Sequence, residues 1–214
     1  FILMGITSWY VKSSYSKWSR IRATSGLTGA QAAQRLISTG SLYGVQIQGI
    51  AGNLTDHYDP RNKTLNLSQG VINSPSVAAV AIAAHELGHA MQDAEDYIPL
   101  RFRAALVPAV NIGSYLGWIM IMAGLLLRMT NLAWLGVLVF SGGAVFALIT
   151  LPVEFNASAR AKQLLVQTGI IQTDEEMRGV NAVLNSAALT YVAGLVTALM
   201  QLVYFATLVG GRRR

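Results

Sequence analysis

Three long stretches without a charged residue constrain this chain more than any other feature of its sequence. They are residues 104–127, 129–153 and 179–211, and each exceeds the roughly 20 residues that a helix needs to cross the hydrocarbon core of a bilayer. One such stretch is compatible with a buried helix of a soluble domain, but three in 214 residues indicate membrane spans. Only 12% of the residues are charged, about half the share in an average globular protein. The composition therefore excludes an ordinary soluble domain, and it also excludes a disordered chain.

A shorter apolar stretch opens the chain at residues 1–11. The sequence begins with Phe1 rather than Met, and Ser8-Trp9-Tyr10 is a poor signal-peptide cleavage site. We therefore expect the end of a first span that starts upstream of the printed sequence. The predicted spans are 1–11, 105–127, 131–151 and 187–209.

Four spans place residues 12–104 and 152–186 on one side of the membrane, and all ten acidic residues lie in these two segments. We therefore predict a mainly α membrane protein with about four transmembrane helices and a small α+β domain built from two separate segments. In chain order, the expected parts are the end of the first span (1–11), the first part of the polar domain (12–104), a membrane hairpin (105–151), the second part of the domain (152–186), and the last span with a basic tail (187–214).

Two capping signals predict helices in the first polar segment. Thr28 and Gln31 form a capping box for a helix that ends near residue 40. Ser74 comes directly before Pro75, a pair typical of an N-cap and first turn, and predicts a helix over residues 75–94.

Two segments between these helices alternate apolar and polar side chains, which is typical of strands. They are residues 45–48 and 64–68, and a turn is expected at 59–62. We expect a short β-hairpin or sheet. Because the strand 64–68 comes just before the second helix, we expect its edge to hold an extended substrate by strand addition.

The sequence His85-Glu86-Leu87-Gly88-His89 lies inside the predicted helix 75–94. Histidines four residues apart share one face of a helix, so both imidazoles can reach one metal ion. Glu86 is adjacent to His85 and is placed to take a proton from metal-bound water. The chain has three histidines, and two of them fall at this spacing. The pattern predicts a zinc site with Zn²⁺ as the cofactor.

Catalytic zinc sites use three protein ligands and a water, so one more ligand is required. A metzincin would have a glycine and a histidine where Gln92 and Glu95 stand. A thermolysin-like carboxylate would fall near Ala109, inside a predicted span. Both of these patterns are disfavoured.

Glu154 lies just past the end of the predicted span 131–151, after Pro152 and Val153. Between His89 and Glu154 the chain crosses the membrane twice, which returns both residues to the same face. We therefore predict His85, His89 and Glu154 as the zinc ligands. His57 is the next candidate, although its position in a polar loop favours substrate binding or local hydrogen bonding.

Four further residues are candidates for supporting roles. Ligating histidines need an acceptor for their other ring nitrogen, and Asn156, Ser158 and Arg160 follow the third ligand closely. Tyr191 lies near the start of the last span, where a phenol is able to donate to a developing oxyanion. A role for Tyr191 in the aromatic belt at the membrane interface is favoured over this one.

Four stretches of the sequence resemble the YugP-like neutral zinc metallopeptidases of bacterial membranes. They are Ser25 to Gly29 (SGLTG), Leu54 to Pro60 (LTDHYDP), Ala84 to Ala90 (AHELGHA) and Leu151 to Ser158 (LPVEFNAS). The resemblance spans most of the chain and implies a bacterial membrane protease whose zinc is held by two histidines and one glutamate. The family is similar in plan to HtpX-type and CaaX-processing membrane proteases, in which an aspartate follows the glutamate by four residues. Ser158 stands at that position here, so the usual carboxylate is missing or replaced by Asn156.

The predicted function is therefore a membrane-embedded zinc endopeptidase, a hydrolase that cleaves membrane or membrane-proximal proteins with Glu86 as general base. The expected partners are a protein or peptide substrate and the lipid bilayer. The alternative is a non-catalytic zinc-binding or scaffold subunit of a larger membrane complex. Small-residue stretches at 113–117 and 136–143 suit packing against partner helices or a second copy of the chain. A metal transporter is disfavoured because the predicted spans carry no ionisable residue that would mark an ion path.

The net charge of +6 is an orientation signal rather than a nucleic-acid surface. Twelve Lys and Arg residues lie on the side of the polar domain and four on the other side. The positive-inside rule therefore favours a multi-pass protein of the cell membrane with a cytoplasmic catalytic domain. The tail Arg212-Arg213-Arg214 argues for the opposite orientation. No cysteine is present, so neither a disulfide nor a thiolate ligand is available.

Overall fold

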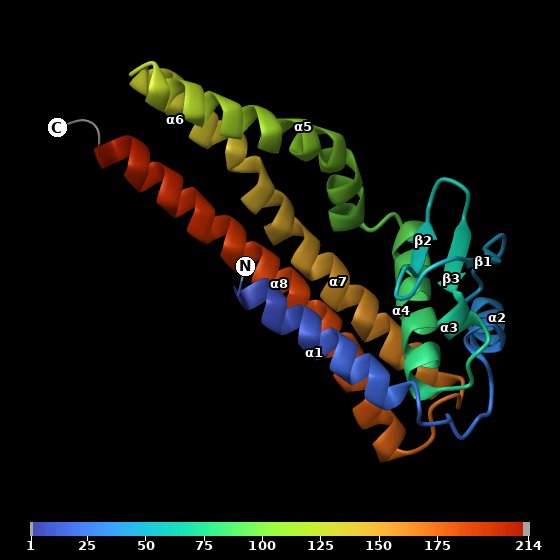
Figure 1. The fold of residues 1–214 in the computed structure, drawn as a ribbon. Helices are drawn as coiled ribbons and strands as arrows, with labels where there is room; N and C mark the ends of the chain where they lie inside the picture. Colours follow the sequence, from blue (N-terminus) through green and yellow to red (C-terminus); the bar gives the residue numbers. More distant parts are fainter. Residues whose placement is uncertain (1, 212–214) are drawn as a thin grey trace.

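A computed structural model describes residues 2–211 and shows long helices that extend to one side of a small α+β domain (Figure 1). Phe1 and the basic tail at 212–214 lie outside the described residues. In chain order the elements are α1 (Ile2–Trp18), α2 (Gly29–Thr39), β1 (Gln46–Ile50), β2 (His57–Asp59), β3 (Thr64–Ser68), α3 (Gln69–Ile72), α4 (Val77–Ala94), α5 (Ile98–Leu126), α6 (Thr130–Phe140), α7 (Gly142–Gln167) and α8 (Asp174–Gly210).

The three strands form one sheet in the order β1-β3-β2. The predicted sheet and the strand at 64–68 are therefore present, but the pairing differs from a simple hairpin. β1 runs parallel to β3, and the antiparallel partner of β3 is β2, a three-residue strand that the alternation pattern did not predict. Because β3 is central, both of its edges are paired, so the expectation that its edge receives a substrate is wrong. The free edge next to α4 belongs to β2.

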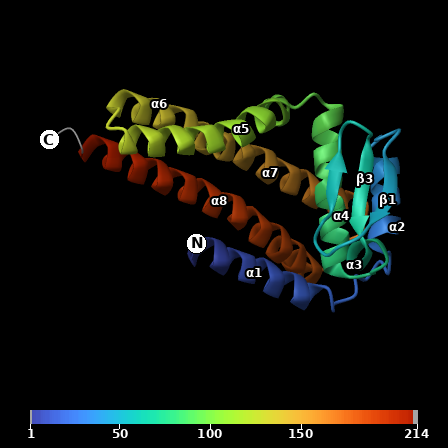
Figure 2. The same cartoon turned by 45° about the horizontal axis from the view of Figure 1, so that its top comes forward.

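α4 lies between the sheet and the long helices, as two views of the molecule show (Figure 2). Its first turns are built from small apolar residues that are fully buried, so neighbouring elements approach it closely on several sides. The helix begins two residues later than expected. Its N-cap is Ser76 rather than Ser74, and the Ser76 hydroxyl accepts a hydrogen bond from the Ala79 N–H at 3.2 Å. The capping box of Thr28 and Gln31 at the start of α2 is present as predicted.

Three helical stretches of the described chain are long and apolar enough to cross a membrane, judged by length and composition. They are Ile98–Leu126, Thr130–Gln167 and Asp174–Gly210. The fourth span, expected at the start of the chain, stays a prediction. The 17-residue helix α1 packs along α8 (Figures 1 and 2).

The helices continue past the points where the apolar stretches end. α7 runs through Pro152 to Gln167, so Glu154 lies inside a helix and not in the first turn of a new one. α8 likewise carries both polar and apolar residues from Asp174 to Gly210. The reason is that charge marks where a helix leaves the lipid, whereas a helix ends only where its backbone hydrogen bonds end. α7 and α8 are therefore shared between the polar domain and the apolar stretches.

Candidate metal centre

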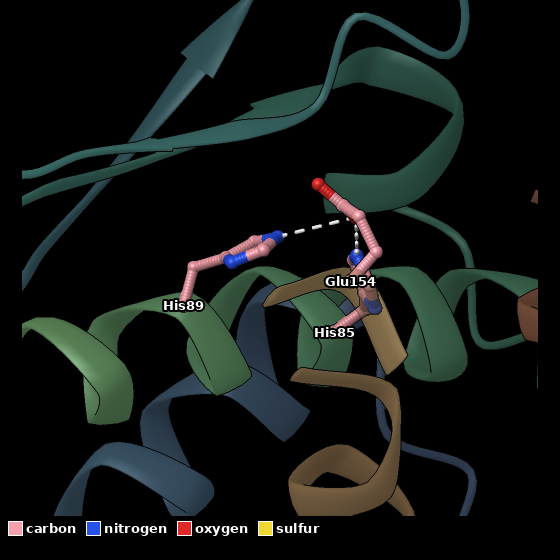
Figure 3. A group of neighbouring side chains, drawn as sticks. All are labelled: His85, His89 and Glu154. Carbon is pink, nitrogen blue, oxygen red and sulfur yellow. Dashed lines mark hydrogen bonds and ion pairs between the residues drawn. The ribbon is translucent and has the colours of Figure 1, made fainter. Parts of the chain in front are cut away.

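Two helices contribute three metal-binding side chains to one point. His85 and His89 come from α4 and Glu154 from α7, and both imidazoles point toward the carboxylate (Figure 3). Glu154 Oε2 lies 3.3 Å from His85 Nε2 and 3.6 Å from His89 Nε2. The Glu154 side chain is 2% exposed, while the two imidazoles are 13% and 12% exposed. One edge of the cluster is thus open to a ligand.

The spacing of these atoms fits a zinc ion. Two ligands that lie about 2.0–2.1 Å from one ion in a tetrahedral arrangement are about 3.3 Å apart, close to the two distances to Glu154. The candidate ligand atoms of the three residues all lie within 4.8 Å of one another. Two nitrogens and one carboxylate oxygen, with a position left for water, form a donor set typical of catalytic zinc. Among the described residues, this is the only such group of three histidine or acidic side chains.

Gly88 explains how α4 and α7 come close enough for the glutamate to reach the histidines. A Cβ atom at Gly88 would lie only 2.4 Å from the backbone oxygen of Ala157. The two helices therefore touch backbone to backbone between the histidines on α4 and beside Glu154 on α7. Any larger residue at position 88 would move α7, and with it Glu154, away from the imidazoles.

The second nitrogen of each imidazole has a hydrogen-bond partner. His89 Nδ1 lies 3.0 Å from the Gln92 side-chain oxygen, and His85 Nδ1 lies 3.1 Å from the Ser158 hydroxyl oxygen. The Gln92 amide nitrogen donates to the Val153 carbonyl, so the oxygen that faces His89 must accept. His89 therefore carries its proton on Nδ1, which leaves Nε2 free to bind a metal.

Gln92 is fully buried and links the two halves of the site. Its amide nitrogen also donates to Asn156 Oδ1 at 2.9 Å, and the same oxygen accepts from Arg160 Nε at 2.7 Å. The Arg160 guanidinium in turn makes two hydrogen bonds to the Glu95 carboxylate, at 2.6 and 2.7 Å. A continuous chain of hydrogen bonds thus runs from His89 across α7 and back to the end of α4.

The edge strand of the sheet holds Glu86 beside the cluster of His85, His89 and Glu154, called the triad below. Its Oε2 accepts a hydrogen bond from the Tyr58 N–H of β2 at 3.2 Å. The Tyr58 hydroxyl donates to Asp93 on the same helix at 3.0 Å, so β2 is fixed to α4 at two points. Burial raises the pKa of Glu86 above its usual value, and a raised pKa suits a carboxylate that must exchange protons near neutral pH.

The electrostatics of the triad centre on its buried carboxylate. Burial lowers the pKa of His89, but the hydrogen bond to Glu154 and the charge of Glu86 outweigh it, so the pKa lies above the usual value. Arg103, from the start of α5, places a guanidinium nitrogen 3.1 Å from Glu154 Oε1. Its side chain is 28% exposed, so the buried carboxylate is paired with a partly exposed cation.

The other predicted site residues lie at different distances from the metal ligands. Ser158 contacts His85 directly, whereas Asn156 and Arg160 reach His89 only through Gln92. Ser158 thus lies beside a ligand at the position where the HtpX-type pattern has an aspartate. Tyr191 lines a cavity together with His85 and Glu86.

His57 is exposed and is not part of the cluster. Its Nδ1 lies 2.9 Å from the Thr55 carbonyl oxygen, which matches the local hydrogen bonding favoured above. Gln92, Arg103 and Tyr58 also lie at the site and were not predicted from the sequence. For Gln92 a signal existed, because it follows His89 by three residues and so shares its helix face. Arg103 and Tyr58 arrive from other elements and had no such signal.

A buried His-His-Glu group at the junction of apolar helices and a small α+β domain defines the class of membrane-associated zinc metallopeptidases. The chain belongs to the family described as "Putative neutral zinc metallopeptidase", which it matches over residues 1–210. It is 44% identical over 205 residues to the "Putative membrane protease YugP" of Bacillus subtilis (strain 168), which covers 94% of this chain and 91% of the relative. No solved structure matches the chain.

Proposed function

We propose that this chain is a multi-pass membrane zinc endopeptidase that cleaves peptide bonds of membrane or membrane-proximal proteins. The observation that carries the proposal is the cluster of three donor side chains, with Glu154 buried, both imidazoles partly exposed and a separate carboxylate, Glu86, beside it. A purely structural zinc site closes the coordination sphere with a fourth protein ligand. Among the described residues no fourth histidine or acidic side chain joins the cluster.

His85, His89 and Glu154 would hold the ion, with Ser158 and Gln92 fixing the two imidazoles. When bound, zinc polarises a carbonyl group and makes a water molecule more acidic. Arg103 balances part of the negative charge of Glu154 and keeps its carboxylate oriented toward the imidazoles. The ligands are thereby arranged before an ion arrives, which reduces the cost of ordering them.

Glu86 would act as general base. Its carboxylate takes a proton from the attacking water, whose oxygen forms the new bond to the carbonyl carbon of the substrate. The same proton passes to the amine as the C–N bond breaks, so Glu86 ends the cycle ionised. The hydrogen bond from the Tyr58 N–H holds one carboxylate oxygen in place, which leaves the other for this proton transfer.

The substrate would approach between the sheet edge and the open side of the triad. β2 is the edge strand next to α4, and its outward Tyr58 N–H is already used by Glu86. Arg103 and Tyr191 are the donors best placed to bind a carbonyl oxygen that gains negative charge. We further propose that α1 is part of a fourth span and that the catalytic domain faces the cytoplasm, on the basis of the twelve Lys and Arg residues on that side.

Replacement of Glu86 by Gln tests the chemistry. The purified, zinc-loaded protein in detergent is incubated with a randomised peptide library, and new termini are identified by mass spectrometry. We expect the wild type to cleave and Glu86→Gln to lose at least about 100-fold in rate while it retains one zinc per chain. Cleavage at the wild-type rate by this variant would contradict the role of Glu86. Bound zinc without any cleavage by the wild type would favour the non-catalytic, complex-forming alternative.

A further inference from the structure

A cavity of about 200 Å³ adjoins the metal centre on the side of His85 and Glu86. Its remaining wall is mostly apolar and comes from α1, the loop before β2, α4 and α8. The apolar residues are Val11, Leu54, Ile82, Val183, Leu184 and Ala187. The metal-binding helix and the membrane helices therefore enclose one apolar pocket directly beside the proposed general base.

We propose that this pocket binds one large apolar side chain of the substrate, at a residue that flanks the scissile bond. The inference rests on the proposed peptidase function and assigns its main determinant of specificity. The volume suits a single side chain, since an engineered cavity of about 150 Å³ holds one benzene molecule. It is far too small for a helix, whose diameter with side chains is about 10 Å.

Two of the polar side chains of the wall, Asp56 and Glu86, are carboxylates that already accept hydrogen bonds from the protein. Both carboxylate oxygens of Asp56 are used by Ser68, which donates its N–H at 2.7 Å and its hydroxyl at 3.0 Å. Glu86 accepts from the backbone of β2 and is required for proton transfer. An acidic substrate residue would meet these two carboxylates and be repelled, so the pocket selects against aspartate and glutamate.

Leu54 adds a second observation at the same cavity. Its backbone φ is 55°, a left-handed conformation that a leucine rarely adopts, and its side chain is 39% exposed. A bulky apolar residue is thus held in an unfavourable backbone conformation with much of its surface uncovered, next to the catalytic groups. An apolar substrate side chain in the pocket would cover this surface.

The pocket also lies at a defined depth. Val11 directly precedes Lys12, the first basic residue after the predicted first span, and Ala187 is the first residue of the predicted last span. The substrate residue would therefore enter where two spans meet the aqueous domain. This favours substrates that are cut close to the membrane surface.

Cleavage-site profiling of the full-length, zinc-loaded protein tests the proposal. With the same peptide library, we expect one of the two positions that flank the cut to favour Leu, Met or Phe over Ala by at least about 10-fold, and to exclude Asp and Glu. Ala187→Phe should fill the pocket and shift this position toward Gly and Ala. Leu189→Phe introduces the same ring at a residue of α8 that is 44% exposed and outside the pocket, and it should leave the profile unchanged.

A binding measurement keeps the test independent of turnover and of variant folding. N-acetyl-leucine hydroxamate should bind the zinc-loaded wild type at least about 10-fold more tightly than the alanine analogue, and the aspartate analogue should bind more weakly than either. Three results would overturn the pocket assignment. They are equal affinities for the leucine and alanine analogues, a preference for Lys or Arg at both positions that flank the cut, and a cleavage profile that Ala187→Phe does not change. Absence of any cleavage by the wild type, in contrast, would contradict the proposed peptidase function itself.

Discussion

Gln92 provides the sharpest test of how the protein prepares its metal centre. The side chain is fully buried, accepts from His89 and donates to Val153 and Asn156. When zinc occupies Nε2, the proton of His89 must stay on Nδ1, which needs the Gln92 oxygen as acceptor. In a zinc-free variant that lacks this acceptor, the proton is able to move to Nε2, near Glu154. Loss of the acceptor therefore penalises the metal-bound form selectively.

Gln92→Leu keeps the size of the side chain and removes its hydrogen bonds. A buried donor left without an acceptor costs about 1–3 kcal/mol, so we expect zinc affinity to fall about 5- to 150-fold. Gln92→Glu retains the acceptor for His89 but loses the two donated bonds. This variant should therefore bind zinc at least as tightly as the wild type while it melts at a lower temperature in both the zinc-free and the zinc-loaded form.

Competition with a zinc-chelating dye measures the affinity, and thermal unfolding in detergent with and without chelator measures stability. Gln163→Leu is the matched control, because Gln163 is exposed on α7 and lies away from the site. A zinc affinity of Gln92→Leu within twofold of the wild type would refute the reasoning. So would a Gln92→Glu variant that loses as much affinity as Gln92→Leu.

Three further changes probe the ligands and the contact between the helices. Glu154→Ala removes a charged ligand and should lower zinc affinity more than 100-fold, seen as loss of zinc after dialysis; full zinc content would place the third ligand elsewhere. Gly88→Ala puts a Cβ atom 2.4 Å from a backbone oxygen of α7, so it should destabilise the fold by about 1–3 kcal/mol and weaken zinc binding. Gly194→Ala is the control, because no atom lies within 4 Å of its Cβ, and it should change neither stability nor zinc binding. Arg160 lowers the pKa of Glu95, so their ion pair stabilises the fold above the unfolded-state pKa and loses its effect as pH falls through the lower, folded-state value. Glu95→Gln should therefore be less stable than the wild type at neutral pH, by no more than about 1 kcal/mol because such pairs are screened. Its melting temperature should lie slightly below that of the wild type at neutral pH, and the two melting temperatures should become equal in acid.

Features that depend on neighbours in sequence were predictable. The capping box at the start of α2, the strand at residues 64–68 and the helix that carries the two histidines are set by side chains within a few residues of one another. Even the choice of Glu154 followed from a simple count, because two crossings of the membrane return the chain to the same face. The structure brings that carboxylate to His85 across 69 residues of sequence, and to His89 on the same helix face.

Features that depend on contacts between distant elements were not predictable from the sequence pattern. β2 has only three residues, too few for alternation to be visible, yet it is the edge strand that holds Glu86. Arg103 is one of the twelve basic residues on the side of the polar domain, and nothing in the sequence indicated that it pairs with Glu154. The end of the apolar stretch at residue 151 was taken as the end of a helix, but α7 continues because its backbone hydrogen bonds do.

The sequence by itself therefore indicated the membrane and the two histidines of the metal centre. Several charge-free stretches of more than 20 residues are typical of membrane spans, and two histidines one helical turn apart are typical of a shared metal ligand. Only the tertiary structure decided how the donors meet. The backbone contact at Gly88, the buried amide of Gln92 and the apolar pocket beside Glu86 join residues from several elements, and such contacts exist only once the helices have packed.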